Sequence, residues 1–439
     1  MSATSKAPDR SPETGAAGAF SHRLSLRGLF ARLGPGVITG AADDDPSGIA
    51  TYSQAGAAAG MGLLWTVVLT WPMMVAVQSV SARIGRVTGH GLAGNMVRIF
   101  PRPLVFALVA LLLVANTINI GADLAAMGAA AELVAGGYAH IYTLLFAAVS
   151  LLAVVFVPYH RYVSFLKWTT FSLFAYVGVV FAVQIDWRAV GVGALWPRFT
   201  VDGDTLTLIV AIFGTTISPY LFFWQSSQEV EDEEADPQAG PLVDHPEQAK
   251  RELGRIGWET WLGMAYSNLI AFFIILTTAV TLNASGHTDI ATSAQAAAAL
   301  RPIAGDFAFA LFSLGIIGTG LLAVPVLAGS AAYAVGEAGG WRIGLERKPD
   351  EARRFYGVIG VAILLGIGVD LSPVDPIKAL LWSAVLNGVI TVPIMAAMML
   401  VASRRDRMGP FVATKGQLIG GWLTSAMMAV ASVAMFVLM

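Results

Sequence analysis

The chain contains no cysteine and carries few charges. With 0 Cys among 439 residues, disulfides, thiolate metal sites and thiol redox chemistry are excluded. Asp, Glu, Lys and Arg together make up 13% of the residues, about half their share in a soluble globular domain. Apolar residues make up 56% of the chain, and the mean hydropathy is +0.67. This composition predicts a polytopic membrane protein.

The sequence also lacks the motifs of soluble enzymes. No Walker A motif, dinucleotide fingerprint, zinc-ligand spacing or Ser-His-Asp arrangement occurs, and a net charge of -2 gives no indication of a partner. We therefore expect neither an enzyme nor a bound cofactor, and no nucleic-acid partner. Residues 1–28 are polar and lack an apolar signal-peptide region. We expect them to form a disordered cytoplasmic tail, followed by a single transmembrane domain at 29–439.

Long apolar segments occur throughout that domain. A membrane-spanning helix needs roughly 20 mostly apolar residues, and eleven segments of the chain satisfy this requirement. The predicted spans lie near 34–59, 62–82, 103–128, 140–158, 163–185, 205–227, 258–282, 305–335, 354–370, 376–401 and 416–438.

The basic residues are consistent with this number of spans and give an orientation. Lys and Arg concentrate in the cytoplasmic loops of membrane proteins. If the N-terminus is cytoplasmic, all 27 Lys and Arg fall in inside segments except Arg188, Arg198, Arg301 and Lys378. An odd number of spans then places the C-terminus outside. We expect a monomer in the lipid bilayer of a bacterial inner membrane.

Two of the predicted spans are interrupted. The first contains DDDPSG at 43–48, and the sixth contains GTTISPY at 214–220. A simple proline kink is an alternative for the sixth span, but a kink does not need aspartates, and a charge at this depth costs ~2.5–3.5 kcal/mol. The interrupted spans are five helices apart. We therefore predict repeats at about 30–186 and 203–401, an extra helix at about 416–438, and a transport site at the midplane.

One long insertion separates the sixth and seventh spans. Residues 228–255 begin with acidic side chains and end with basic ones. We expect a solvated cytoplasmic linker there, and a regulatory cation sensor is the alternative.

The side chains at the two interruptions favour a cation. Asp44 and Asp45 are expected at the C-terminal end of the first half-helix, where unpaired carbonyls carry partial negative charge. The sixth span adds the carbonyl of Thr215 and the hydroxyl of Ser218. Carboxylates together with free carbonyls predict a cation site and exclude an anion site.

The third span contributes a polar stripe. Asn116, Asn119 and Asp123 are spaced by three and four residues, so they share one helical face; interhelical hydrogen bonding is the alternative role for them. All the candidate ligand atoms are oxygens, and neither His nor Met falls at either interruption. Oxygen ligands suit hard ions such as Mg2+, Ca2+ and Mn2+. Sodium or a proton also fits this chemistry.

These motifs resemble those of the Nramp family of divalent metal transporters. The resemblance covers roughly residues 30–435 and implies an all-α, leucine-transporter-like fold. That fold has an inverted repeat of helices 1–5 and 6–10, with helices 1 and 6 broken at the midplane. The similar motifs are GPG at 34–36, DPSGIAT at 45–51, QAGA at 54–57, ADLA at 122–125 and GTTISPY at 214–220.

The chain departs from the family's pattern at the expected ligand positions. The asparagine of the family's Asp-Pro-Gly-Asn motif is here Gly48, and the methionine of its sixth helix is Ser218. The family's alanine carbonyl position is Thr215, and its two histidines in that helix correspond to Tyr220 and Gln225. The thioether that favours softer metals is therefore missing from its family position.

This set of departures resembles the Nramp-related magnesium transporters, a prokaryotic branch of the family. That resemblance implies transport of Mg2+ and Mn2+ with much of their hydration shell and without clear proton coupling, since Ala126 also replaces an acidic residue. The metal is then a substrate. Alternatives are a proton-coupled Mn2+/Fe2+ importer of the main Nramp type and an amino-acid or sodium symporter of the same fold. The candidate metal-contacting residues are Asp45, Thr215, Ser218, Gly48, Asp123 and Asp44.

Overall fold

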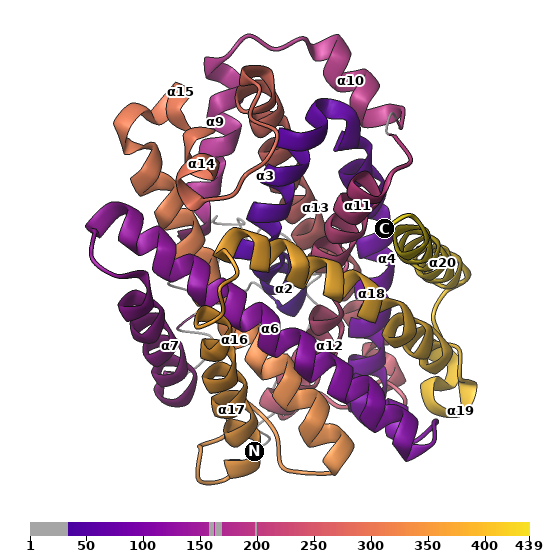
Figure 1. The fold of residues 1–439 in the computed structure, drawn as a ribbon. Helices are drawn as coiled ribbons and strands as arrows, with labels where there is room; N and C mark the ends of the chain where they lie inside the picture. The colour runs from indigo at the N-terminus through magenta and orange to yellow at the C-terminus, as the bar shows by residue number, and fades with distance from the viewer. Residues whose placement is uncertain (1–33, 158–161, 163–168, 198–199) are drawn as a thin grey trace, which may run out of the picture.

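The structure, a computed structural model, describes residues 34–157, 162, 169–197 and 200–439. Within these residues every regular element is a helix, as expected (Figure 1). The predicted tail at 1–28 lies outside them. The longer helices are α2 (Pro35–Asp43), α3 (Pro46–Ala59), α4 (Leu64–Thr88), α6 (Arg102–Ala135), α7 (Ala139–Phe156), α9 (Phe174–Ala182), α10 (Trp187–Leu195), α11 (Gly203–Thr216), α12 (Pro219–Ala235), α13 (Ala249–Thr281), α16 (Ala308–Gly339), α17 (Arg353–Asp370), α18 (Pro376–Ala402) and α20 (Lys415–Leu438). Short helices are α5 (Leu92–Val97), α14 (Ser293–Ala298), α15 (Arg301–Ala304) and α19 (Arg405–Met408).

The lengths and apolar composition of the helices indicate a multi-pass membrane protein. In the described part of the chain, 8 helical segments are long and apolar enough to cross a membrane, which confirms the membrane class. The number of eleven spans stays a prediction. The predicted fifth span, 163–185, begins outside the described residues, and α9 covers only its second half.

The chain is interrupted at both predicted places. The first span divides into α2, which ends at Asp43, and α3, which begins at Pro46. The sixth span divides into α11, which ends at Thr216, and α12, which begins at Pro219. A proline at the first helical position loses no hydrogen bond, because that N–H has no partner within the helix. Each proline therefore starts a second half-helix and does not merely bend a continuous one.

Helix α2 lies against α13 at backbone contact distance. A β carbon added at Gly40 would lie 2.3 Å from the backbone carbonyl carbon of Gly263, and one added at Gly36 would lie 2.7 Å from the backbone nitrogen of Thr260. Only glycine permits so close an approach. This contact fixes the position of the first half-helix.

The connection between α12 and α13 is shorter than the predicted linker at 228–255. Helix α12 continues through the acidic run to Ala235, and α13 begins at Ala249, so only 236–248 connects them. The prediction of a solvated linker from residue 228 is therefore wrong for both ends of the segment.

Two arginines explain why the acidic run is helical. Arg255 Nη2 of α13 lies 2.5 Å from Glu229 Oε2, and Arg86 Nη1 of α4 lies 3.0 Å from Glu233 Oε2. Glu229 is fully buried. Arg86 comes from a helix distant in sequence, whereas Arg255 lies at the basic end of the same segment. The local charge pattern does not show that these arginines pair with buried glutamates, so it suggested a solvated segment.

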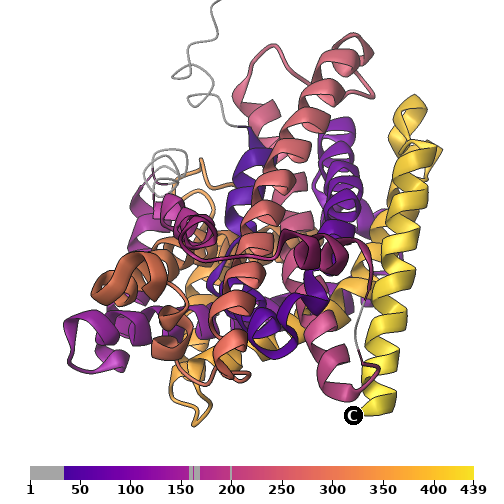
Figure 2. The same ribbon diagram turned by 90° about the horizontal axis from the view of Figure 1, so that it is seen from above.

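The remaining helices surround the two interrupted ones. In Figure 1, α6 runs obliquely across the bundle, and α16 packs against it. Helix α20 stands at one edge of the bundle in both views (Figure 1 and Figure 2), where it contacts α18, α11 and α4.

Candidate metal site

Asp45 is the N-cap of the second half-helix, α3. Its Oδ1 accepts hydrogen bonds from the Gly48 backbone N–H and the Ser47 hydroxyl, both at 2.7 Å. Its Oδ2 accepts one from Asn119 Nδ2 of α6 at 3.0 Å. The expected position at the C-terminal end of the first half-helix is therefore wrong for Asp45. The α3 N-terminus stabilises the negative charge that this buried residue carries when ionised.

The hydrogen bonds of Asp45 limit what else it can bind. An ionised carboxylate offers about four lone-pair directions, and three donors already approach this one. Few directions therefore remain for direct contact with an ion, and a water molecule can bridge the carboxylate to it.

At the second interruption, hydroxyl groups hydrogen-bond to the backbone carbonyls that the broken helix leaves free. Ser218 Oγ lies 2.8 Å from the carbonyl oxygens of both Gly214 and Thr215, and its single proton is shared between them or donated to one at a time. Thr391 Oγ1 of α18 donates to the carbonyl of Ile217 at 3.1 Å. The Thr215 carbonyl, a predicted ligand, therefore has a hydroxyl partner, while the Ser218 oxygen keeps its acceptor lone pairs.

The two interruptions meet at Gly48. Ser47 Oγ lies 3.5 Å from Thr215 Oγ1. A β carbon added at Gly48 would lie 3.2 Å from Thr215 Oγ1 and 3.5 Å from the carbonyl oxygen of Asp43. The absence of a side chain at Gly48 allows the breaks to approach one another. Asp45, Gly48, Thr215 and Ser218 thus occupy one region of the structure, as the sequence predicts.

Asp123 adds a second buried carboxylate to this region. It is 0% exposed and lies close enough to Asp45 for the two charges, when both are ionised, to repel one another. Neither of its oxygens has a hydrogen-bond partner among the described residues. Its oxygens are therefore available to a cation, to a proton or to the water shell of an ion.

The polar stripe of α6 divides between two roles. Asn116 Nδ2 donates to the Leu327 carbonyl and to Ser330 Oγ on α16, both at 2.8 Å, which is the interhelical role given above as the alternative. Asn119 instead orients Asp45, and its Oδ1 accepts a hydrogen bond from Ser383 Oγ of α18 at 2.6 Å.

Asp44 lies apart from Asp45. Its Oδ1 accepts a hydrogen bond from Ser267 Oγ of α13 at 3.1 Å, and Asp43 Oδ2 lies 2.5 Å from the same hydroxyl. Asp44, a candidate ligand from the sequence, thus lies on the α13 side of the break, whereas Asp45 contacts α6. Sequence reasoning missed Ser267, because one small hydroxyl in an apolar helix carries almost no local signal.

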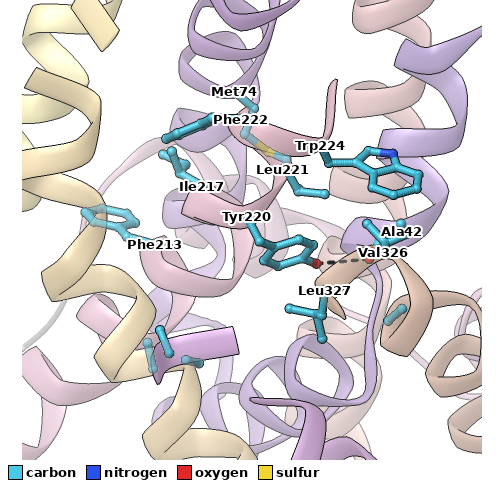
Figure 3. Close-up of a cluster of buried hydrophobic side chains, with 14 of the residues drawn as sticks. Ala42, Met74, Phe213, Ile217, Tyr220, Leu221, Phe222, Trp224, Val326 and Leu327 are labelled. Atoms are coloured by element: carbon cyan, nitrogen blue, oxygen red, sulfur yellow. Dashed lines mark hydrogen bonds between the residues drawn. The ribbon is translucent and has the colours of Figure 1, made fainter. Parts of the chain in front are cut away.

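Tyr220 connects the second interruption to the first. Its hydroxyl donates to the Ala42 carbonyl at 3.1 Å, within a cluster that includes Phe213, Leu221 and Trp224 (Figure 3). The ring is fully buried. Tyr220 thereby binds the last turn of α2 from α12, a contact that sequence reasoning did not identify.

A cavity approaches the region from one end of the bundle. It has a volume of about 510 Å³ and lies where α3, α11 and α18 meet, with Gln54, Asp204, Lys378 and Trp382 in its lining. Ala50, also in the lining, is one helical turn from Ser47. A hydrated ion at the end of this cavity beside Ala50 would be one turn from the break.

The chemistry of the region suits a cation held with part of its water. In the part of the chain that the structure describes, no three His, Cys, Asp or Glu side chains are arranged to hold a metal ion. Asp45, Asp123 and the hydroxyls of Ser47, Thr215 and Ser218 supply oxygen atoms only. Mg2+ binds proteins in this manner, through one or two carboxylates and several waters.

Proteins of known family and structure resemble this chain over most of its length. The family model described as "Natural resistance-associated macrophage protein-like" (Nramp) matches residues 36–438. The "Divalent metal cation transporter MntH" of Klebsiella pneumoniae is 26% identical over 417 residues, covering 92% of this chain and 94% of the relative. The protein of the same name from Yersinia pestis is 28% identical over 402 residues, covering 89% and 91%.

Two solved structures share the fold. A manganese transporter of Eremococcus coleocola, crystallised with an aromatic bis-isothiourea compound, has a TM-score of 0.72 and 17% identity; the match covers 94% of this chain and 87% of that one. Mhp1, a nucleobase-cation-symport-1 family transporter in a closed conformation, has a TM-score of 0.53 and 13% identity, with 91% and 93% covered.

Proposed function

Because the chain belongs to the Nramp family of divalent metal transporters, we propose that it carries Mg2+, with Mn2+ as a second substrate, by alternating access and without proton coupling. The observation that carries the proposal is the set of oxygen atoms where the two interruptions meet. Asp45, Thr215, Ser218 and Asp123 contribute to it, Gly48 leaves the space between the interruptions free of a side chain, and no thioether occupies the family's methionine position, Ser218.

The hydrogen bonds around the site favour a hydrated ion. Asp45 already receives three hydrogen bonds, and the Thr215 carbonyl has the Ser218 hydroxyl as a partner. Few atoms remain for direct coordination. Mg2+ loses its waters reluctantly. A site with one or two direct ligands, and with other oxygen atoms that hydrogen-bond to the waters the ion keeps, matches this preference.

The absence of proton coupling is consistent with the residues of α12. Tyr220 and Gln225 stand where the family has histidines, and both make hydrogen bonds: Tyr220 donates to the Ala42 carbonyl, and Gln225 Nε2 donates to Thr260 Oγ1 at 3.0 Å. The membrane potential alone suffices for accumulation. A divalent ion that crosses an inside-negative potential of 100 mV gains ~4.6 kcal/mol, more than about a thousandfold in concentration.

Transport assays in proteoliposomes test the proposal. We expect uptake of Mg2+ and Mn2+ that an inside-negative potential accelerates and that an imposed pH gradient does not drive. A pH-sensitive dye inside the vesicles reports coupling, and Ca2+ and Cd2+ complete the selectivity panel. Metal-dependent acidification that persists with the potential clamped would refute uncoupled transport.

A second candidate function is a proton-coupled Mn2+ importer. Two observations favour it. Asp123 is a buried carboxylate without a hydrogen-bond partner among the described residues and can carry a proton. One turn later on α6, Met127 places its sulfur 2.4 Å from a β carbon added at Gly320, beside Pro46, so a softer side chain packs near the first break. The acidification assay separates the two candidates.

We further propose a monomer in a bacterial inner membrane, with a cytoplasmic N-terminus and an external C-terminus. The distribution of Lys and Arg supports this orientation.

A further inference from the structure

The three consecutive aspartates face two different neighbours. Asp45 contacts α6 through Asn119, whereas Asp43 and Asp44 both contact the Ser267 hydroxyl of α13, at 2.5 and 3.1 Å. The break of the helix after Asp43 is what separates them.

Asp43 and Asp44 have too few hydrogen-bond donors. Their side chains are 0% and 1% exposed. The Ser267 hydroxyl has a single proton and donates to one of them at a time. Asp43 Oδ1 and Asp44 Oδ2 are buried and have no hydrogen-bond partner in the described part of the chain. Buried carboxylates without partners are costly unless a positive charge accompanies them.

The surroundings of this pair supply further oxygen atoms and no positive charge. Both aspartates lie at the C-terminal end of α2, where the backbone carries partial negative charge. The Tyr52 side chain is fully buried next to this pair: its ring and the carbonyl oxygen of Asp43 lie 3.3 and 3.5 Å from the same β carbon added at Gly48. No ion pair joins either aspartate to a Lys, Arg or His that the structure describes.

We propose that Asp43, Asp44 and the Ser267 hydroxyl form a second divalent-cation site between α2 and α13, separate from the Asp45 site. The inference rests on the proposed transport function. Two carboxylates balance the charge of one divalent ion, and an all-oxygen set suits a hard ion such as Mg2+ or Mn2+. The helix C-terminus stabilises a cation at this position.

The second site gives the ion a place to bind once it leaves Asp45. The carbonyl oxygen of Asp43 lies 3.5 Å from a β carbon added at Gly48, so the two sites are contiguous through the backbone of the break. An ion held by Asp43, Asp44 and Ser267 would also join α2 to α13. Release from this site would then accompany separation of these two helices.

Counting bound Mn2+ tests the proposal. Purified full-length protein is titrated with Mn2+ at neutral pH, up to millimolar concentration, and free Mn2+ is measured by electron paramagnetic resonance. We expect two bound ions per wild-type chain, one for the double variant Asp43→Asn with Asp44→Asn, and one for Asp45→Asn. Glu351→Gln, an exposed carboxylate between α16 and α17, should still bind two. If the double variant fails to fold, Ser267→Ala should weaken the second ion at least about tenfold.

The outcomes separate this inference from the proposed function. A single wild-type ion that Asp45→Asn removes and the Asp43 and Asp44 substitutions leave in place would overturn the second site, while transport stands. A single ion lost in both variants would show one shared site and would also overturn it. No bound ion together with no vesicle uptake of Mn2+ or Mg2+ would overturn the proposed function itself.

Discussion

At the scale of single residues, Asp45 combines a structural and a transport role that substitution can separate. Asn is as good an N-cap as Asp, whereas Ala in that position costs about 1 kcal/mol. We expect both Asp45→Asn and Asp45→Ala to abolish Mg2+ and Mn2+ uptake, because both remove the charge. Only Asp45→Ala should also lower the thermal unfolding temperature.

Vesicle uptake and thermal unfolding of the two variants are measured side by side. Wild-type uptake by Asp45→Asn would contradict the assignment of Asp45 as the residue that binds the ion.

Gly48 and Ser218 are expected to set metal selectivity. The double variant Gly48→Asn with Ser218→Met restores the family's side chains, and sulfur binds Cd2+ and Mn2+ better than it binds Mg2+. The new asparagine would also crowd the retained waters, since its β carbon lies only 3.2 Å from Thr215 Oγ1. We expect the uptake ratio of Cd2+ to Mg2+ to rise at least about tenfold.

The control for this variant is Ser218→Ala. It removes the hydroxyl that donates to the Gly214 and Thr215 carbonyls without adding sulfur. An equal change in selectivity in the control would attribute the effect to the lost hydrogen bond. An unchanged ratio in the double variant would show that these positions do not determine selectivity.

The sequence predicted which residues lie near the metal site better than it predicted where their side chains point. Proline, glycine and aspartate in one apolar segment indicated the break and the region around Asp45. The backbone changes direction at the break, and this change decides where the side chains after it point. The separation of Asp44 from Asp45 therefore depends on backbone angles that no local pattern specifies. Ser267 became significant only through its contacts with Asp43 and Asp44.

At the scale of helices, the contact between α2 and α13 predicts a sharp difference between glycines. In Gly40→Ala the added carbon would lie 2.3 Å from the Gly263 backbone, so the helices must separate. Overpacking of this kind costs about 1–3 kcal/mol, and we expect a lower thermal unfolding temperature and slower uptake.

Gly257→Ala on α13 is the matched control. Nothing lies within 4 Å of its added β carbon, and replacing glycine by alanine inside a helix stabilises by roughly 0.5–1 kcal/mol. Equal unfolding temperatures for Gly40→Ala and Gly257→Ala would show that the close contact does not contribute to stability.

Helix ends were predictable where proline or glycine marks them and not where charge pairs do. Pro46 and Pro219 start the second half-helices as expected. The end of α12 was missed by several residues, because buried pairing with Arg86 and Arg255 overrides the usual solvation of a glutamate-rich run.

At the scale of the whole molecule, the orientation is testable because the chain has no Cys. A single introduced cysteine is then the only thiol. We expect His287→Cys to react with a membrane-impermeant maleimide in intact cells, and Lys415→Cys to react only after permeabilisation, since His287 is exposed in a loop and Lys415 is exposed at the first position of α20. The reverse pattern would contradict the cytoplasmic N-terminus.

The all-helical membrane class followed from composition and hydropathy, which are global properties. The tertiary arrangement did not, because contacts such as that of Asn119 with Ser383 join residues far apart in sequence. The predicted fold came from a resemblance in short motifs, and the shared architecture with two solved transporters agrees with it.

The helices are held to their neighbours by different kinds of contact, and this difference affects how they can move. Helix α12 is joined to α13 and α4 by the buried pairs Glu229–Arg255 and Glu233–Arg86, and a buried charge left without its partner costs about 3–5 kcal/mol. Helix α2 touches α13 through uncharged glycine backbones. Helix α2 is also held by the hydrogen bonds of Ser267 and Tyr220, and these carry no ion pair. We therefore expect α4, α12 and α13 to move as one unit and α2 to be the helix that shifts relative to them.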